Sequence, residues 1–124
     1  MILTVYTETV IDIAHSIRGY NGNCQHTHGH TQKICVWVRG DSRFQDKDGI
    51  LFDFNNVKKI KEKYDHKLLN EINPFDVMNP TAENISFTIY CFLHHESKPG
   101  LQFKVRVYET SIGKETYCEC GDFE

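Results

Sequence analysis

The chain has 124 residues, a formal net charge of −3 at pH 7, and a composition that is 40% hydrophobic and 25% charged. This composition is typical of a globular protein, and the length predicts one domain over residues 1–124. No run of basic residues indicates a nucleic-acid surface, and no apolar stretch is long enough for a transmembrane span. The N-terminus lacks the pattern of a signal peptide and the five cysteines are an odd number, so we expect a cytoplasmic location with reduced thiols.

The first part of the chain predicts two strands joined by a turn. Residues 2–17 are rich in β-branched side chains, and polarity alternates from Val5 to His15. A turn cluster follows at 19–23, and residues 30–40 alternate again. We expect these two strands to pair in an antiparallel hairpin.

The middle of the chain predicts two helices. Residues 55–64 carry apolar side chains at helical spacing, with Asp53 or Asn55 as the expected N-cap. Residues 81–95 predict the second helix, which Thr81 can cap through its hydroxyl group.

The last part predicts two more strands. Residues 101–110 alternate cleanly, and residues 114–120 form a short final strand. The order β-β-α-α-β-β predicts an α+β fold, with a four-stranded antiparallel sheet and two helices on one face. Such a sheet has two open edges, which favour pairing with other subunits.

A cluster of histidines is the clearest chemical signal. His26, His28 and His30 occupy every second position, and Cys24 stands two residues before the first. On a strand, His28 and His30 lie on one face and can converge on a single ion such as Zn²⁺. The third ligand stays open, because His26 has the same parity while His15 could lie opposite the pair across the hairpin.

Three further features have possible chemical roles. Cys24 is either a fourth metal ligand or a reactive thiol, because a nearby cation promotes loss of the thiol proton. Asp65 could orient His66 as a proton carrier, although adjacent residues face each other only where the backbone is irregular. Glu109 continues an apolar strand face, so it either grips a planar N–H edge with two hydrogen bonds or has reached solvent at the strand end.

These features occur within an ordered set of motifs. The set comprises Ala14-His15, Cys24-x-x-x-His28-Gly29-His30, FDF at 52–54, DHKLLN at 65–70, NPTAEN at 79–84 and VYET at 107–110. Together they resemble the 6-pyruvoyltetrahydropterin synthase and 6-carboxytetrahydropterin synthase family over nearly the whole chain. The resemblance implies the tunnelling fold, in which three subunits close a twelve-stranded barrel and two trimers form a homohexamer with active sites between subunits.

The resemblance also implies roles for individual residues. It implies Zn²⁺ as the cofactor and 7,8-dihydroneopterin triphosphate as the substrate. The matching positions are His15, His28 and His30 for the zinc ligands, Cys24 for the catalytic thiolate, Asp65 and His66 for proton transfer, Glu109 for the pterin anchor, and Thr81 and Glu83 for the pocket wall.

The family has two main reaction branches. One eliminates triphosphate to give 6-pyruvoyltetrahydropterin. The other also cleaves a carbon–carbon bond, releases acetaldehyde and gives 6-carboxytetrahydropterin for queuosine and other 7-deazapurines. The compact chain and its NPTAEN motif are more similar to the second branch. A third variant, acting in folate synthesis, carries glutamate at the position of Cys24, so Cys24 argues against it.

Two departures from the family pattern affect the expected pocket wall. Ile11 and Ile13 stand where the family usually has phenylalanine and alanine, and Thr27 stands where an apolar residue is usual. These changes leave the expected metal ligands and base in place. The competing class is a non-catalytic zinc- or pterin-binding relative with the same fold.

Overall fold

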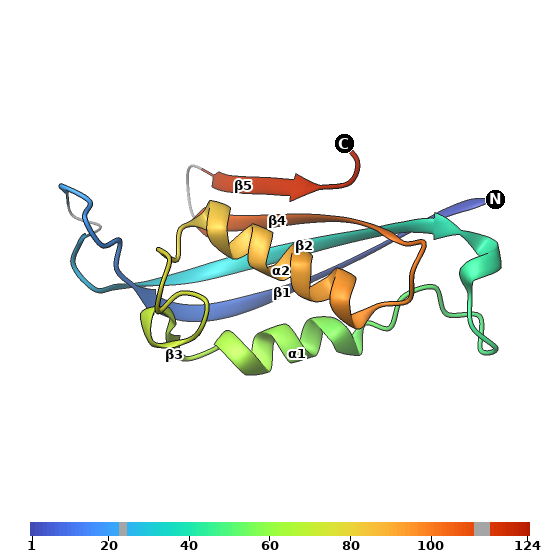
Figure 1. Cartoon of the computed structure of the whole chain (residues 1–124), viewed down its shortest axis with the longest axis horizontal. Helices are drawn as coiled ribbons and strands as arrows, with labels where there is room; N and C mark the ends of the chain where they lie inside the picture. Colours follow the sequence, from blue (N-terminus) through green and yellow to red (C-terminus); the bar gives the residue numbers. More distant parts are fainter. Residues whose placement is uncertain (23–24, 111–114) are drawn as a thin grey trace.

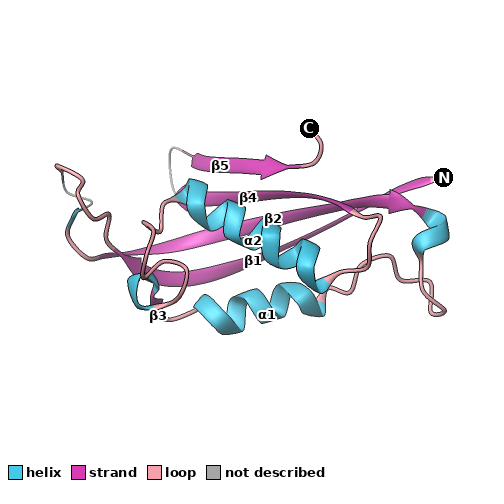
Figure 2. Cartoon of the chain, viewed as in Figure 1, coloured by secondary structure: helices cyan, strands magenta, loops and turns pink. Residues whose placement is uncertain are grey.

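The computed structural model describes residues 1–22, 25–110 and 115–124 (Figure 1). The chain is an α+β protein with one five-stranded sheet in the order β3-β1-β2-β4-β5. Two helices, α1 (Asn55–Tyr64) and α2 (Ala82–Glu96), lie against the same face of this sheet (Figure 2). Among the described residues, no helix is both long enough and apolar enough to cross a membrane.

The strands form a sheet that is antiparallel except at one edge. β1 (Ile2–His15) and β2 (His28–Asp41) pair antiparallel over the whole 14-residue length of each strand. β2 also pairs antiparallel with β4 (Gln102–Thr110), and β4 pairs antiparallel with β5 (Thr116–Gly121). At the other edge, β3 (Lys67–Leu68) runs parallel to β1. Among the described residues, 3₁₀ turns lie at Ser42–Phe44 and Leu69–Glu71.

The short strand β3 corrects the predicted four-stranded antiparallel sheet. Its two residues pair with Ile13 and Ala14 of β1, which makes a fifth strand and a mixed sheet. A two-residue strand is too short to show an alternating pattern, so the sequence does not predict it. The pairing holds the preceding residues, Asp65 and His66, beside the end of β1.

The two helices begin in different ways. Thr81 caps α2 as predicted, because its hydroxyl oxygen accepts a hydrogen bond of 3.1 Å from the N–H of Asn84. The predicted cap of α1 is wrong, since Phe54 occupies the N-cap position and makes no capping bond through its side chain. Asp53 instead accepts a 2.9 Å hydrogen bond from the N–H of Asn55, so a carboxylate one residue further out satisfies one first-turn donor.

The hydrophobic core lies between the sheet and the helices. Because strand side chains alternate between faces, β1, β2 and β4 contribute alternate residues to this core. Its main members are Ile11 and Ile13 of β1, Ile34, Val36 and Val38 of β2, Phe103, Val105 and Val107 of β4, Val57 and Ile60 of α1, and Ile85, Ile89 and Leu93 of α2. His15, Gln32 and Glu109 share the parity of these core residues, so the sheet turns them toward the helices at one end of the core.

The opposite face of the sheet is polar and aromatic. Trp37, the one tryptophan of the chain, packs against Tyr6 with ring centroids 5.0 Å apart. Lys104 Nζ lies 4.3 Å and Arg106 Cζ 5.2 Å from the centre of the Trp37 ring, so two cations cover this ring. This face therefore carries cation–aromatic contacts where the other face carries the apolar core.

Candidate metal centre

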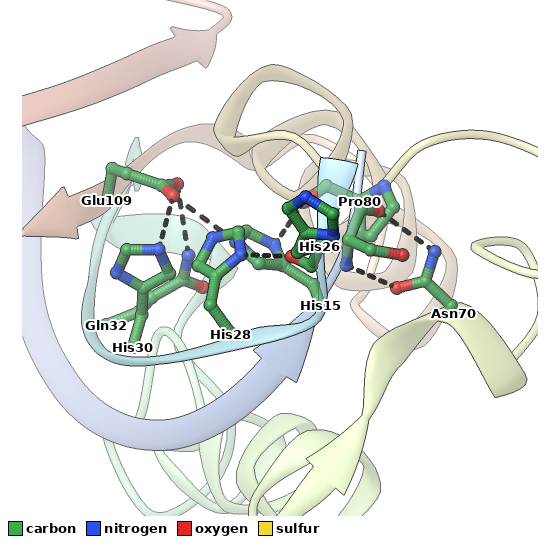
Figure 3. A network of polar contacts seen from close by, with 9 residues as sticks. His15, His26, His28, His30, Gln32, Asn70, Pro80 and Glu109 are labelled. Atoms are coloured by element: carbon green, nitrogen blue, oxygen red, sulfur yellow. Dashed lines mark hydrogen bonds and ion pairs between the residues drawn. The ribbon is translucent and has the colours of Figure 1, made fainter. Parts of the chain in front are cut away.

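Three of the predicted metal ligands meet at the end of the β1–β2 hairpin (Figure 3). His15 is the last residue of β1 and pairs directly with His28, the first residue of β2, while His30 lies two residues further along. The ring centroids are 4.7 Å apart for His15 and His28, 5.0 Å for His15 and His30, and 4.7 Å for His28 and His30. The antiparallel register thus selects His15 over His26 as the third member of the cluster.

Backbone carbonyl groups fix the orientation of two of these rings. His15 Nδ1 lies 2.8 Å from the carbonyl oxygen of Pro80, and His28 Nδ1 lies 2.7 Å from that of His26. A carbonyl only accepts, so each Nδ1 carries a proton, and in the neutral ring each Nε2 is then left with a lone pair. His26 therefore contributes to the site through its main chain.

The three Nε2 atoms are the strongest indication of a bound cation. Those of His15, His28 and His30 are all buried, and none makes a hydrogen bond to a described residue. Buried polar atoms are almost always hydrogen-bonded, so three converging exceptions call for a partner. A divalent metal ion is such a partner, because it binds neutral imidazole through this lone pair.

Glu109 brings a carboxylate to the same point. Its Oε1 lies 3.3 Å from His15 Nε2 and 3.0 Å from His30 Nε2, and the four possible ligand atoms all lie within 4.8 Å of one another. These are ion-pair distances, yet a neutral His15 ring with its proton on Nδ1 has none on Nε2 to donate. The donor set is therefore three imidazoles and one carboxylate, which suits zinc or another divalent transition metal.

The charges of the cluster also fit a metal centre. Burial lowers the pKa of His30, and the neighbouring His15 and His28 add to this effect against the opposing carboxylate. Burial alone would raise the pKa of Glu109, but the histidines outweigh it and the pKa is lowered. A neutral imidazole and an ionised carboxylate are the forms that bind a cation.

Gln32 is a member of the site that the sequence analysis does not identify. Its side chain is completely buried, its Nε2 lies 3.4 Å from Glu109 Oε2, and its Oε1 has no hydrogen-bond partner among the described residues. The available signal was its parity, since Gln32 follows His28 and His30 on the same strand face.

A cavity of about 450 Å³ adjoins the cluster. His15 and Glu109 line one part of it, and Thr81 and Glu83 line another, so the structure brings these predicted residues to one cavity. Tyr20 also contributes to the wall, although the sequence analysis assigns it no role.

Asp65 and His66 belong to a second cluster, together with Asp12. Asp65 Oδ1 accepts a 2.9 Å hydrogen bond from the N–H of Asp12, and the N–H of His66 donates to the Asp12 carbonyl at 2.7 Å. His66 has a φ of 57°, which is the irregular backbone that the adjacent pair needs. Its Nε2 comes within 3.6 Å of Asp65 Oδ2.

The two clusters are separate groups of side chains. On β1, Asp12 has the opposite parity to His15, so its carboxylate points away from the helices and bonds to Thr31 at 2.6 Å. Within one chain, the structure does not join Asp65 and His66 to the three histidines as one ligand group. Cys24 lies outside the described residues, so its assignment as the catalytic thiolate stays a prediction.

The fold and the histidine cluster define an α+β protein with a candidate metal centre at one end of its sheet. A family model described as 6-pyruvoyl tetrahydropterin synthase matches residues 4–120. The chain belongs to this family, as its ordered motifs predict.

Individual proteins that resemble this chain carry names of the same family. The 6-carboxy-5,6,7,8-tetrahydropterin synthase of Haemophilus influenzae is 30% identical over 136 residues, covering 90% of this chain and 94% of the relative. The 6-pyruvoyl tetrahydrobiopterin synthase of Homo sapiens is 33% identical over 98 residues, covering 72% of this chain and 66% of the relative. The structure of the Caenorhabditis elegans 6-pyruvoyl tetrahydropterin synthase matches with a TM-score of 0.76 at 21% identity, over 99% of this chain and 97% of that one. The structural match confirms the predicted fold of the single chain.

Proposed function

We propose that this chain is a zinc-dependent 6-carboxy-5,6,7,8-tetrahydropterin synthase of queuosine and 7-deazapurine biosynthesis. It would convert 7,8-dihydroneopterin triphosphate to 6-carboxytetrahydropterin, with release of acetaldehyde and triphosphate. The observation that carries the proposal is the convergence of three buried Nε2 atoms, without hydrogen-bond partners among the described residues, beside the cavity that Glu109, Thr81 and Glu83 line. The Haemophilus influenzae relative, which bears the name of this enzyme, supports the choice of reaction.

The residues of the chain would divide the work as follows. His15, His28 and His30 would hold zinc, which supplies Lewis acidity to substrate hydroxyl groups. Glu109, as an ionised carboxylate, would accept hydrogen bonds from the N–H and amino edge of the pterin. Cys24 would remove a proton as the thiolate, and Asp65 would orient His66 to relay protons.

The separation of the two clusters supports a shared active site. In one chain, His66 and the three histidines belong to different groups of candidate ligands. We infer that copies of this chain assemble as a homohexamer of two trimers, in which a neighbour supplies its Asp65–His66 pair. The open edges of β3 and β5 are available for the pairing that closes such a ring.

The deciding experiment is a product assay. Zinc-loaded protein is incubated with 7,8-dihydroneopterin triphosphate, and both acetaldehyde and the pterin product are measured. Acetaldehyde together with 6-carboxytetrahydropterin supports the proposal. The alternative, a 6-pyruvoyltetrahydropterin synthase, is favoured by the human relative and would give the 6-pyruvoyl product without acetaldehyde. No consumption of substrate would identify a non-catalytic relative.

The role of Cys24 needs a separate variant. Cys24→Ala should abolish turnover and leave zinc bound, because the thiolate acts on the substrate. Loss of zinc from this variant would make Cys24 a metal ligand instead. Cobalt substitution distinguishes these roles independently, since a cobalt–thiolate bond adds a charge-transfer band to the absorption spectrum.

A further inference from the structure

We propose that Glu109 is a fourth metal ligand in the substrate-free protein, and that Gln32 is the positioning residue that aims it. This inference rests on the proposed metal site and gives Glu109 a second role besides holding the pterin edge. The Glu109 carboxylate would occupy the fourth coordination position of the metal until substrate binds.

The distances around Glu109 Oε1 carry the first part of the inference. This oxygen lies 3.0 Å from His30 Nε2 and 3.3 Å from His15 Nε2. Ligand atoms bound to one tetrahedral zinc ion lie roughly 3.3–3.5 Å apart, given zinc–ligand bonds of about 2.0–2.2 Å. The distance from the carboxylate oxygen to His15 Nε2 falls in this range, and the distance to His30 Nε2 is 0.3 Å shorter than its lower end.

The protonation of the rings gives a second reason. His15 Nε2 has a lone pair because its Nδ1 proton points to the Pro80 carbonyl. A carboxylate oxygen at 3.3 Å from that lone pair would repel it, since both atoms are acceptors. A cation between them would turn this repulsion into coordination, so for the neutral ring the contact is favourable with a metal present.

Gln32 explains how the carboxylate is held in this orientation. Its Nε2 lies 3.4 Å from the other carboxylate oxygen, Oε2, which leaves Oε1 free to face the histidines. Burying this amide destabilises the fold, because the Oε1 of Gln32 is buried and has no hydrogen-bond partner among the described residues. An apolar side chain of similar shape would avoid this cost, so we attribute the buried amide to its contact with Glu109.

The first test is the zinc affinity of matched variants of the full-length protein, measured by competition with a chromogenic chelator. Glu109→Gln and Glu109→Asp should each weaken zinc binding by at least about 10-fold, by analogy with changes around other metal sites. Glu109→Asp keeps the negative charge but shortens the side chain by one methylene. It therefore separates direct coordination of the metal from electrostatic attraction by a nearby carboxylate. Wild-type affinity in Glu109→Asp would overturn the proposal.

Gln32→Met tests the positioning role, because methionine has a similar length and no amide. Its zinc affinity should fall by about 10–100-fold, the usual effect of removing a group that orients a ligand. The thermal stability of the zinc-free variant should stay equal or rise, because the unpartnered Oε1 is gone. Lower zinc-free stability with unchanged zinc affinity would show a merely structural role and overturn the assignment.

A linkage measurement tests whether the Glu109 carboxylate binds both zinc and the pterin edge, one at a time. Unsubstituted pterin, which lacks the side chain that meets the metal, is titrated by fluorescence into zinc-free and zinc-loaded protein. It should bind the zinc-free protein more tightly, and it should weaken zinc binding by the same factor. Equal or tighter pterin affinity in the zinc-loaded protein would show that Glu109 does not leave zinc to bind pterin, and would overturn the proposal.

The variant His28→Ala separates this inference from the proposed function. If His28→Ala loses zinc while the Glu109 variants retain wild-type affinity, only the role of Glu109 fails. If His28→Ala retains wild-type zinc affinity, the metal site itself is wrong and the proposed function fails with it.

Discussion

His15 and His28 take their ring orientation from main-chain carbonyl groups rather than from other side chains. The carbonyl of Pro80 comes from the segment before α2, and that of His26 comes from the turn before β2. These contacts place the proton of the neutral ring on Nδ1 and orient Nε2 to bind an ion, which lowers the cost of binding one. The site therefore depends on the backbone path as much as on its ligands.

This arrangement predicts how zinc affects stability. Zinc at 100 times its dissociation constant should stabilise the wild-type fold by about 2.7 kcal/mol, because the unfolded chain has no preformed site. His28→Ala should lose most of this gain. His26→Ala is the matched control, since it keeps the carbonyl that orients His28. Thermal unfolding with and without zinc measures the effect, and a gain that survives in His28→Ala would contradict the assignment.

The backbone of His66 lies in the left-handed region, with φ at 57°. A β-branched residue is strained there, so His66→Val should reduce the free energy of unfolding by about 1–2 kcal/mol. His66→Gly should stay within about 1 kcal/mol of wild type, because glycine adopts this conformation freely. Chemical denaturation of both variants checks this, and equal losses would point to the side chain rather than to the backbone.

Single residues could be predicted from the sequence when their own position gave the signal. The regular spacing of the histidines, and a carboxylate on an apolar face at Glu109, were such signals. Gln32 and Asp12 escaped notice because their importance comes from partners far along the chain. Gln32 on β2 contacts Glu109 on the neighbouring strand β4, and Asp12 on β1 contacts Asp65, which follows α1. These contacts depend on how the strands pair, which residue spacing alone does not fix.

At the scale of elements, Asp122 fastens the C-terminal segment to α2 and β4. The hydroxyl of Tyr90 and the ring of His94 on α2 both contact its carboxylate, the latter at 2.7 Å, and the N–H of Phe103 donates to it at 2.9 Å. Burial opposes ionisation of Asp122, but these donors outweigh it and lower its pKa. The same contact with the carboxylate raises the pKa of Tyr90 to about 12.

These contacts predict a stability effect that depends on pH. Because the folded-state pKa of Asp122 lies below its unfolded value of about 3.9, its contribution is complete above that value and is lost as pH falls through the folded-state pKa. Asp122→Asn should cost about 1–3 kcal/mol at neutral pH and less in acid. Urea unfolding at several pH values measures this, with the exposed Glu115→Gln as the control. A loss that persists unchanged at low pH would contradict the role of the ionised group.

Most elements were visible in the sequence, since the long strands and both helices have clear periods. The starts of the helices and the short edge strand were less accessible. Phe54 takes the N-cap position of α1 although Asp53 and Asn55 are better capping residues, and the Asp53 carboxylate bonds to the N–H of Asn55 from one residue further out. β3 forms only because residues after α1 pair with β1, and this contact between distant segments is not visible in the local sequence.

At the scale of the whole molecule, the proposed sharing of active sites predicts complementation. His28→Ala removes a metal ligand and His66→Asn removes the relay, while asparagine tolerates the left-handed backbone. Each variant alone should be inactive. Dissociating, mixing and reassembling the two should restore part of the activity, because some interfaces then combine an intact metal centre with an intact relay. Activity assays on the mixture check this, and no recovery in verified mixed oligomers would place the whole site in one chain.

Trp37 gives the outer face of the sheet a built-in fluorescent reporter. Because it is the one tryptophan, all indole emission comes from the surface beside Tyr6, Lys104 and Arg106. The two cations should make iodide a stronger quencher than caesium. If three sheets close into a barrel, this surface turns toward the lumen, and dilution that separates the subunits should increase quenching. The emission of a single indole would then follow assembly in solution without any label.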